Sequence, residues 1–84
     1  MVFYDFTFLS LTGAQSGRNV LHSQGIGARL MRAPAQIAAQ GCAYALQVDG
    51  KDALRSAELL RYYAGGFQRS FRVYSDGRIE EAVL

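Results

Sequence analysis

The residue types that could do chemistry gather between Arg29 and Leu46, in the segment RLMRAPAQIAAQGCAYAL. This segment holds the only cysteine of the chain, Cys42, and its only proline, Pro34. It also holds two arginines, Arg29 and Arg32. A cysteine reacts as the thiolate, which nearby cations favour. The sequence therefore indicates thiol chemistry at Cys42, with Arg29 and Arg32 as the flanking cations.

The neighbours of Cys42 in the chain are small, since Gly41 precedes it and Ala43 follows it. Small neighbours are expected to leave the sulfur approachable. A lone cysteine is also common as an inert, small apolar residue of a core. Two interpretations therefore stay open, a reactive thiol and a structural one.

Other chemistries find little support. One cysteine and one histidine, His22, fall short of the three or four ligands of a zinc site. His22 lies near the end of a predicted helix, where the helix dipole favours an exposed histidine. The carboxylates are spread over turns and helix surfaces, and no nucleophile-elbow spacing is present. We expect no metal, no cofactor and no enzymatic activity.

The length and composition of the chain limit the classes of protein to which it can belong. The 84 residues predict a single domain over residues 1–84, and the formal net charge of +2 comes from scattered arginines. The run Arg69–Tyr74 is the nearest approach to a nucleic-acid motif, but it is typical of an alternating strand, and we expect no nucleic-acid partner. No signal peptide or membrane-spanning run is visible, and a lone free thiol suits the cytoplasm.

The first half of the chain predicts two strands and a helix. Residues 2–9 are aromatic-rich and predict a strand. Thr12, with Gln15 three positions on, predicts a helix N-cap, and Gly25 predicts the helix end. Gly17 is expected to allow close approach of this helix to the sheet. Residues 26–32 predict the second strand, which the Ala33–Pro34 pair ends.

The second half predicts a short helical turn over residues 34–40, a strand over residues 43–48 and a second helix capped by Asp49. Gly65–Gly66 ends that helix. Its predicted buried stripe consists of Ala53, Leu54, Ala57, Leu60 and Ala64.

The last part predicts a strand over residues 67–75, a type I′ turn at Asp76–Gly77 and a short edge strand over residues 78–83. The order is βαββαβ plus a hairpin strand. It favours a ferredoxin-like α+β sandwich, with a four-stranded antiparallel sheet and two helices on one face. The other face would then be uncovered and could form a homodimer or dock a partner.

The order of elements and the central motif resemble the sulfur/selenium carrier-like family of small bacterial proteins. The resemblance covers about residues 3 to 75, and its distinctive part is the segment Pro34–Leu46. The family has glycine directly after the cysteine, where this chain has Ala43. The matching positions are Ser10, Leu21, Gly25, Met31, Pro34, Ile37, Cys42 and Leu46.

The resemblance implies a non-enzymatic carrier that holds sulfur or selenium on Cys42 as a persulfide. A cysteine desulfurase-like donor would load the carrier, and an acceptor protein would unload it. Gly41, Ala43, Pro34, Arg29 and Arg32 would then surround the loaded sulfur or contact a partner. The alternative is a small dimerisation or regulatory interaction module in which Cys42 is structural.

Overall fold

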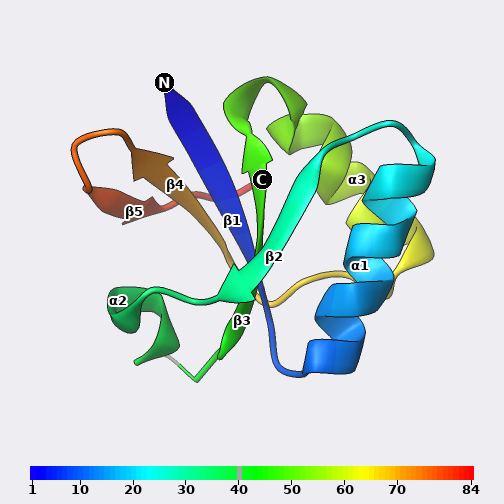
Figure 1. The fold of residues 1–84 in the computed structure, drawn as a ribbon, viewed down its shortest axis with the longest axis horizontal. Coiled ribbons are helices and arrows are strands. Elements are labelled where there is room, and N and C mark those ends of the chain that lie inside the picture. The colour runs from blue at the N-terminus through cyan, green and yellow to red at the C-terminus, as the bar shows by residue number, and fades with distance from the viewer. Residues whose placement is uncertain (40) are drawn as a thin grey trace.

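A computed structural model describes residues 1–39 and 41–84 of the chain (Figure 1). Its strands are β1 (Val2–Phe8), β2 (Ala28–Arg32), β3 (Tyr44–Asp49), β4 (Ser70–Tyr74) and β5 (Ile79–Glu81). Its helices are α1 (Leu11–Ser23), α2 (Ala35–Ala38), α3 (Ala53–Tyr63) and the 3-10 turn η1 (Gly50–Asp52). The fold is α+β, as the sequence predicted.

The strands form one antiparallel sheet in the order β2-β3-β1-β4-β5. The prediction of four strands plus a hairpin strand agrees with this sheet, in which β5 pairs with β4 at one edge. The aromatic strand β1 lies in the centre, between β3 and β4. Continuous hydrophobicity in β1 therefore reflects burial on both of its faces.

One face of the sheet carries the main core, and α1 and α3 cover it (Figure 1). Even-numbered residues of β1 and β3 point to this face because side chains alternate along a strand. The sheet contributes Phe6, Phe8, Leu46 and Val48 to the core, and the helices contribute Ala14, Leu21, Ala57 and Leu60.

Gly17 sets the distance between α1 and this core. A Cβ at Gly17 would lie 3.0 Å from side-chain atoms of Leu46 and Leu60 and 3.1 Å from Phe8. Such contacts are shorter than carbon atoms tolerate without displacement. The predicted role of Gly17 in close helix–sheet approach is confirmed.

The predicted N-cap of α1, Thr12, was wrong by two residues. Helix α1 begins at Leu11, and Ser10 is the cap, its hydroxyl accepting a hydrogen bond from the Gly13 N–H at 3.0 Å. Both residues are good cap types, so local sequence does not separate them. At the other end Gly25 has a φ of 77°, which confirms the predicted stop.

Several element boundaries differ from the predictions. The second strand begins at Ala28, since the Ile26 N–H donates to the Leu21 carbonyl and completes the end of α1. Pro34 is the N-cap of α2 rather than its first residue, and Gln40 lies outside the described residues. The fourth strand begins at Ser70 instead of Phe67, whose ring packs edge-on against Phe6.

The start of α3 also departs from the prediction. The Asp49 carboxylate accepts a hydrogen bond from the Lys51 N–H at 3.1 Å, so Asp49 caps η1 and not α3 itself. In the predicted buried stripe Leu54 is wrong, because it is 67% exposed, and Ser56 is buried instead.

The turn between β4 and β5 is not of type I′. That type requires a positive φ at both central residues, but among the described residues positive φ occurs only at glycines, here at Gly77 (94°). The Gly77 N–H donates to the Tyr74 carbonyl at 3.0 Å, and the Tyr74 N–H donates to the Arg78 carbonyl. These bonds define a three-residue loop in which a type I turn precedes a left-handed glycine.

The second face of the sheet is partly covered, contrary to the prediction of an open face. Helix α2 lies on the side opposite α1 and α3 (Figure 1), and Ile37 of α2 shares a hollow with Phe71 and Ile79 of that face. Asp5 and Thr7 of β1 are fully buried there. The face is therefore neither open over its whole length nor continuously apolar.

Candidate functional site

Cys42 lies in the short connection between α2 and β3, two residues before Tyr44, the first residue of β3. It retains 5% of its accessible surface and stands outside the main core cluster. The expectation that small neighbours leave the sulfur approachable is therefore not met in this conformation. Gly41 and Ala43 on either side are exposed, and Gly41 has a φ of 97°. The backbone around Cys42 is thus open to solvent while its side chain is turned inward.

The segment before Cys42 is held mainly by one apolar side chain. Helix α2 has four residues, and Ile37 is its buried one, with 1% of its surface exposed. Pro34, the N-cap of α2, makes no side-chain capping bond. Before α2, the Ala33 N–H donates to the Ala43 carbonyl at 2.9 Å and ties the end of β2 to the residue after Cys42. A short helix with one anchor is a candidate for local opening.

The two predicted flanking arginines lie at different distances from Cys42 along the sheet. Arg32 is paired with Tyr44, two residues after Cys42, and its guanidinium carbon lies 6.0 Å from the Tyr44 ring centre. Arg29 is paired with Gln47, five residues after Cys42. The two side chains also point to opposite faces of the sheet. Of the two arginines, Arg32 lies nearer to the cysteine segment.

A buried polar pair on the second face was missed by the sequence reading. The Gln47 amide donates to Asp5 Oδ1 at 3.0 Å, and Asp5 Oδ2 is buried without a hydrogen-bond partner. Burial raises the pKa of Asp5, while the Gln47 hydrogen bond and the charge of Arg29 act in the opposite direction. The signal available in the sequence was an aspartate inside an otherwise apolar and aromatic strand.

His22 occupies a defined position near the edge of the sheet. Its Nε2 lies 3.1 Å from the Ala28 carbonyl oxygen, so this ring nitrogen donates to a β2 carbonyl. His22, Arg29 and Asp49 also line a shallow hollow at that end of β2. Histidine at this helix end therefore links α1 to the edge strand.

The arginine-containing run of β4 is occupied by contacts within the protein. Arg72 Nε donates to the Tyr4 hydroxyl at 2.8 Å, and the guanidinium lies 3.6 Å from the Glu80 carboxylate. The two tyrosine hydroxyls that Arg72 contacts, of Tyr4 and Tyr74, raise the pKa of Arg72. Arg69 pairs with Glu81 at 3.4 Å.

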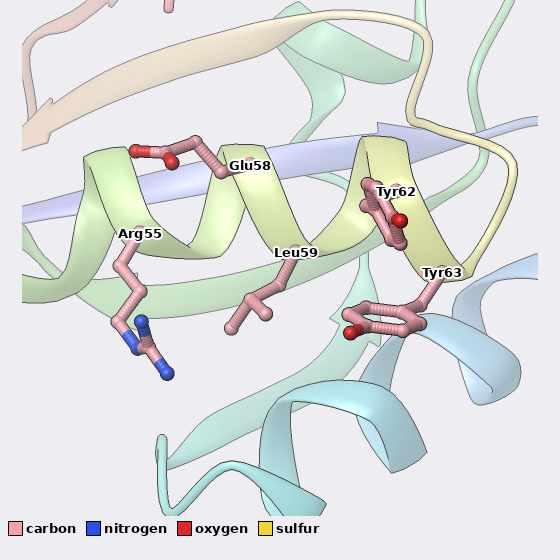
Figure 2. Close-up of a pocket in the computed structure, with 5 residues that line it drawn as sticks. All are labelled: Arg55, Glu58, Leu59, Tyr62 and Tyr63. Atoms are coloured by element: carbon pink, nitrogen blue, oxygen red, sulfur yellow. The ribbon is translucent and has the colours of Figure 1, made fainter.

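The outer face of α3 carries exposed apolar side chains and a hollow of about 190 Å³ (Figure 2). Arg55, Leu59 and Tyr63 project from α3 toward α1, while Glu58 points the other way. Tyr62 and Tyr63 are 81% and 63% exposed and pack edge to face, with ring centres 4.7 Å apart. This surface therefore combines a hollow with two exposed aromatic rings.

The structure supports neither a clustered metal site nor a membrane span in the part of the chain that it describes. Residues 1–39 and 41–84 contain no group of three or more His, Cys, Asp or Glu side chains that could hold a metal ion. Within the same residues no helix is long and apolar enough to cross a membrane.

Fold and site together define a small α+β protein with one buried cysteine beside a four-residue helix. The model of the family described as "Putative Se/S carrier protein-like" matches residues 3–68, more than half of the chain. The chain belongs to this family, which confirms the resemblance seen in the sequence. A search of curated proteins and a search of solved structures each found no match. The family match includes Cys42 and ends before β4.

Proposed function

We propose that this protein is a non-enzymatic sulfur or selenium carrier in which Cys42 accepts the transferred atom. The family match across the cysteine segment is the observation that carries this proposal. Cys42 is the only thiol of the chain, so one loaded sulfur has no resolving cysteine within the same protein. A persulfide on Cys42 would therefore persist until a partner protein takes it.

Loading is a displacement at sulfur. The Cys42 thiolate attacks the terminal sulfur of a persulfide on a cysteine desulfurase-like donor, a new S–S bond forms at Cys42, and the donor thiolate leaves. Electrons and atoms balance without an added oxidant, since the donor already carries the sulfur at the sulfane level. Delivery repeats the step, with a nucleophile of the acceptor protein attacking the terminal sulfur and Cys42 leaving as thiolate.

The burial of Cys42 makes local opening part of this proposal. A donor cannot reach a side chain that is 95% covered, so the structure around Cys42 must open locally before transfer. We propose that helix α2, which precedes Cys42 and has Ile37 as its single buried anchor, is the segment that opens. Closure afterwards would shield the loaded sulfur from water and from unrelated thiols.

Cys42 acts in this proposal as an acceptor and not as a catalyst. Its chemistry requires a reduced thiol, which a reducing compartment such as the cytoplasm maintains. Partner proteins supply the catalytic groups, and the carrier supplies the sulfur position and the docking surface. We propose the ferredoxin-like assignment for its fold, which the strand order β2-β3-β1-β4 and the two covering helices support.

Mass spectrometry of the intact protein tests the carrier function. The protein is incubated with a cysteine desulfurase and cysteine, and we expect a gain of one sulfur atom that a reductant removes. The Cys42→Ser variant is the matched control and should gain nothing. Absence of an adduct on the wild-type protein, with a desulfurase shown to be active, would contradict the carrier proposal.

The second candidate is a homodimeric interaction module in which Cys42 is structural. The exposed Tyr62 and Tyr63 and the neighbouring hollow on α3 favour it. The candidate dimer surface thereby moves from the sheet face, where the sequence placed it, to α3. Light scattering coupled to size-exclusion chromatography should show a dimer that Tyr62→Ser weakens. A monomer at high concentration would count against this candidate.

A further inference from the structure

The free edge of β2 carries backbone groups that no other strand satisfies. The sheet ends at β2 on one side, and β2 pairs with β3 alone among the described strands. Unpaired N–H and C=O groups on an edge strand are a ready template for a further strand. Which residues expose these groups follows from the hydrogen-bond register.

Hydrogen-bonded and non-hydrogen-bonded pairs alternate along an antiparallel ladder. The Ala33 N–H donates to the Ala43 carbonyl, so Ala33 and Ala43 form a hydrogen-bonded pair. Every second pair along the ladder is then also hydrogen-bonded, namely Met31 with Ala45 and Arg29 with Gln47. Ala28, Leu30 and Arg32 therefore direct their N–H and C=O groups outward. The contact of His22 Nε2 with the Ala28 carbonyl agrees with this assignment.

Within residues 1–39 and 41–84, His22 is the side chain that contacts one of these outward groups. It satisfies the Ala28 carbonyl and thereby closes the first part of the edge. Leu30 and Arg32 remain as the residues with outward N–H and C=O groups. An added strand would thus pair along the second half of β2, the half that leads to Ala33 and the cysteine segment.

The charges at this edge select the partner. Arg29 and Arg32 are exposed, and within residues 1–39 and 41–84 neither forms an ion pair. They lie three positions apart and so point to opposite faces of the sheet. Strand β2 contains no acidic residue, so a second copy of β2 would add guanidinium groups without any carboxylate. The edge therefore favours an acidic partner over self-association.

We propose that the edge of β2 binds an extended acidic segment of a partner protein by strand addition, with its acidic residues three positions apart. One acidic side chain meets Arg29 on one face, and the other meets Arg32 on the opposite face. The docked segment ends beside Ala33, whose N–H donates to the residue after Cys42. The inference rests on the proposed carrier function, for which it identifies the docking site of the sulfur donor.

Two synthetic peptides of equal composition test the spacing. The first, Thr-Glu-Val-Thr-Glu-Val-Thr, places its glutamates three positions apart, and the second, Thr-Glu-Val-Glu-Thr-Val-Thr, places them two apart on one face. We expect the first peptide to bind about fivefold more tightly, since cross-strand charge pairs form on both faces. Equal binding of the two peptides, or binding of neither at millimolar concentration, would overturn the proposal.

Nuclear magnetic resonance locates the peptide on the protein. On addition of the first peptide the Leu30 and Arg32 amides should become protected from hydrogen exchange, while the Met31 amide, already bonded to β3, should change little. Protection of the Leu30 amide without peptide, together with a dimeric mass, would show that a second copy occupies the edge. Perturbations confined to α3 would equally overturn the proposal.

Charge reversal provides the matched variants. Arg32→Glu should weaken binding of the first peptide about tenfold, whereas Lys51→Glu, the same charge change at an exposed site away from β2, should leave it within about twofold. Replacing the two glutamates of the peptide by lysine one at a time should give one peptide that regains binding to Arg32→Glu, the peptide whose lysine faces position 32 while its remaining glutamate still meets Arg29. Equal binding by the two variants would contradict the docking site.

Sulfur loading separates this inference from the carrier function. If desulfurase loads wild type and Arg32→Glu at the same rate, the carrier function holds and the docking site is wrong. If Arg32→Glu loads about tenfold more slowly than Lys51→Glu, both are supported. If the peptide binds as expected and no variant gains sulfur, the docking site stands and the carrier function fails.

Discussion

Gln47 donates its side-chain amide to one oxygen of Asp5 at 3.0 Å across the β1–β3 pair, and the other oxygen of Asp5 is buried without a partner. Asp5 is fully buried in the centre of the second face of the sheet. A carboxylate in this position costs stability when it is ionised, because one hydrogen bond does not replace its hydration. We therefore expect the stability of the protein to depend on pH through a carboxyl on the face of the sheet opposite the main core.

We expect stability to fall as pH rises through the titration of Asp5. Burial raises the pKa of this carboxyl in the folded state, so the folded protein binds the proton more tightly than the unfolded chain. The stabilisation that the proton on Asp5 gives to the folded state is complete below about pH 4, and it is lost as the pH rises through the raised pKa. Asp5→Asn should therefore be about 1 kcal/mol more stable than wild type at pH 7, with a smaller difference at lower pH.

Urea unfolding at several pH values between about 2 and 7 measures this effect and includes the acid range in which the control residue titrates. Asp76→Asn is the control of opposite sign. The Arg78 N–H, together with the Arg78 guanidinium, lowers the pKa of Asp76, so this carboxylate stabilises above its unfolded pKa and loses that contribution at low pH. Parallel pH profiles of wild type and Asp5→Asn would show that Asp5 carries no such cost.

Removing the anchor of α2 should expose the thiol. Ile37→Ala deletes the buried side chain of α2, which costs about 2–4 kcal/mol at this site and favours the open segment. We expect a chromogenic disulfide reagent to label Cys42 at least about tenfold faster than in wild type. The exposed neighbour Gln36→Ala is the control and should label at the wild-type rate. If Cys42 in Ile37→Ala is labelled at the wild-type rate, opening of α2 does not control access to the thiol.

Gly17→Ala should destabilise the protein despite the better helix propensity of alanine. The new methyl group would meet Leu46 and Leu60 at 3.0 Å, and overpacking of this kind costs about 1–3 kcal/mol against a propensity gain of about 1 kcal/mol. Gly27→Ala has open space at the Cβ position and should be neutral or slightly stabilising. Thermal unfolding of both variants measures the difference, and equal midpoints would contradict the expected crowding.

The cap of α1 can be located by two alanine variants. Ser10→Ala should cost about 1 kcal/mol, because the Gly13 N–H loses its acceptor. Thr12→Ala removes an exposed hydroxyl inside the first turn and should change the free energy of unfolding by less than about 0.5 kcal/mol. Equilibrium unfolding in urea distinguishes them. The reverse order would restore Thr12 as the cap.

Much of the fold could be read from local pattern. The alternation in β1, the glycine stop at Gly25 and the small face at Gly17 depend on residue periodicity and on backbone geometry, which are properties of short segments. Errors fell where two neighbouring residues offered the same local chemistry, as Ser10 and Thr12 do. The turn type at Gly77 was also beyond the sequence, because one glycine suits several turns.

The candidate site divides in the same way. Residue types alone singled out Cys42 and indicated thiol chemistry, since the chain has one thiol and the family resemblance surrounds it. The burial of that thiol, the covering of the second face by α2 and the Asp5–Gln47 pair depend on contacts between residues far apart in the chain. The tertiary structure brings the residues of each feature together.

The edge position of β2 separates what the sequence determines from what the tertiary structure decides. The sequence by itself determined that Arg29 and Arg32 lie on a strand and point to opposite faces, because side-chain direction alternates along any strand. It could not determine that β2 ends the sheet or that Leu30 and Arg32 turn their backbone groups outward. Those properties follow from which strand pairs with which, and tertiary packing of the helices against the sheet decides that pairing.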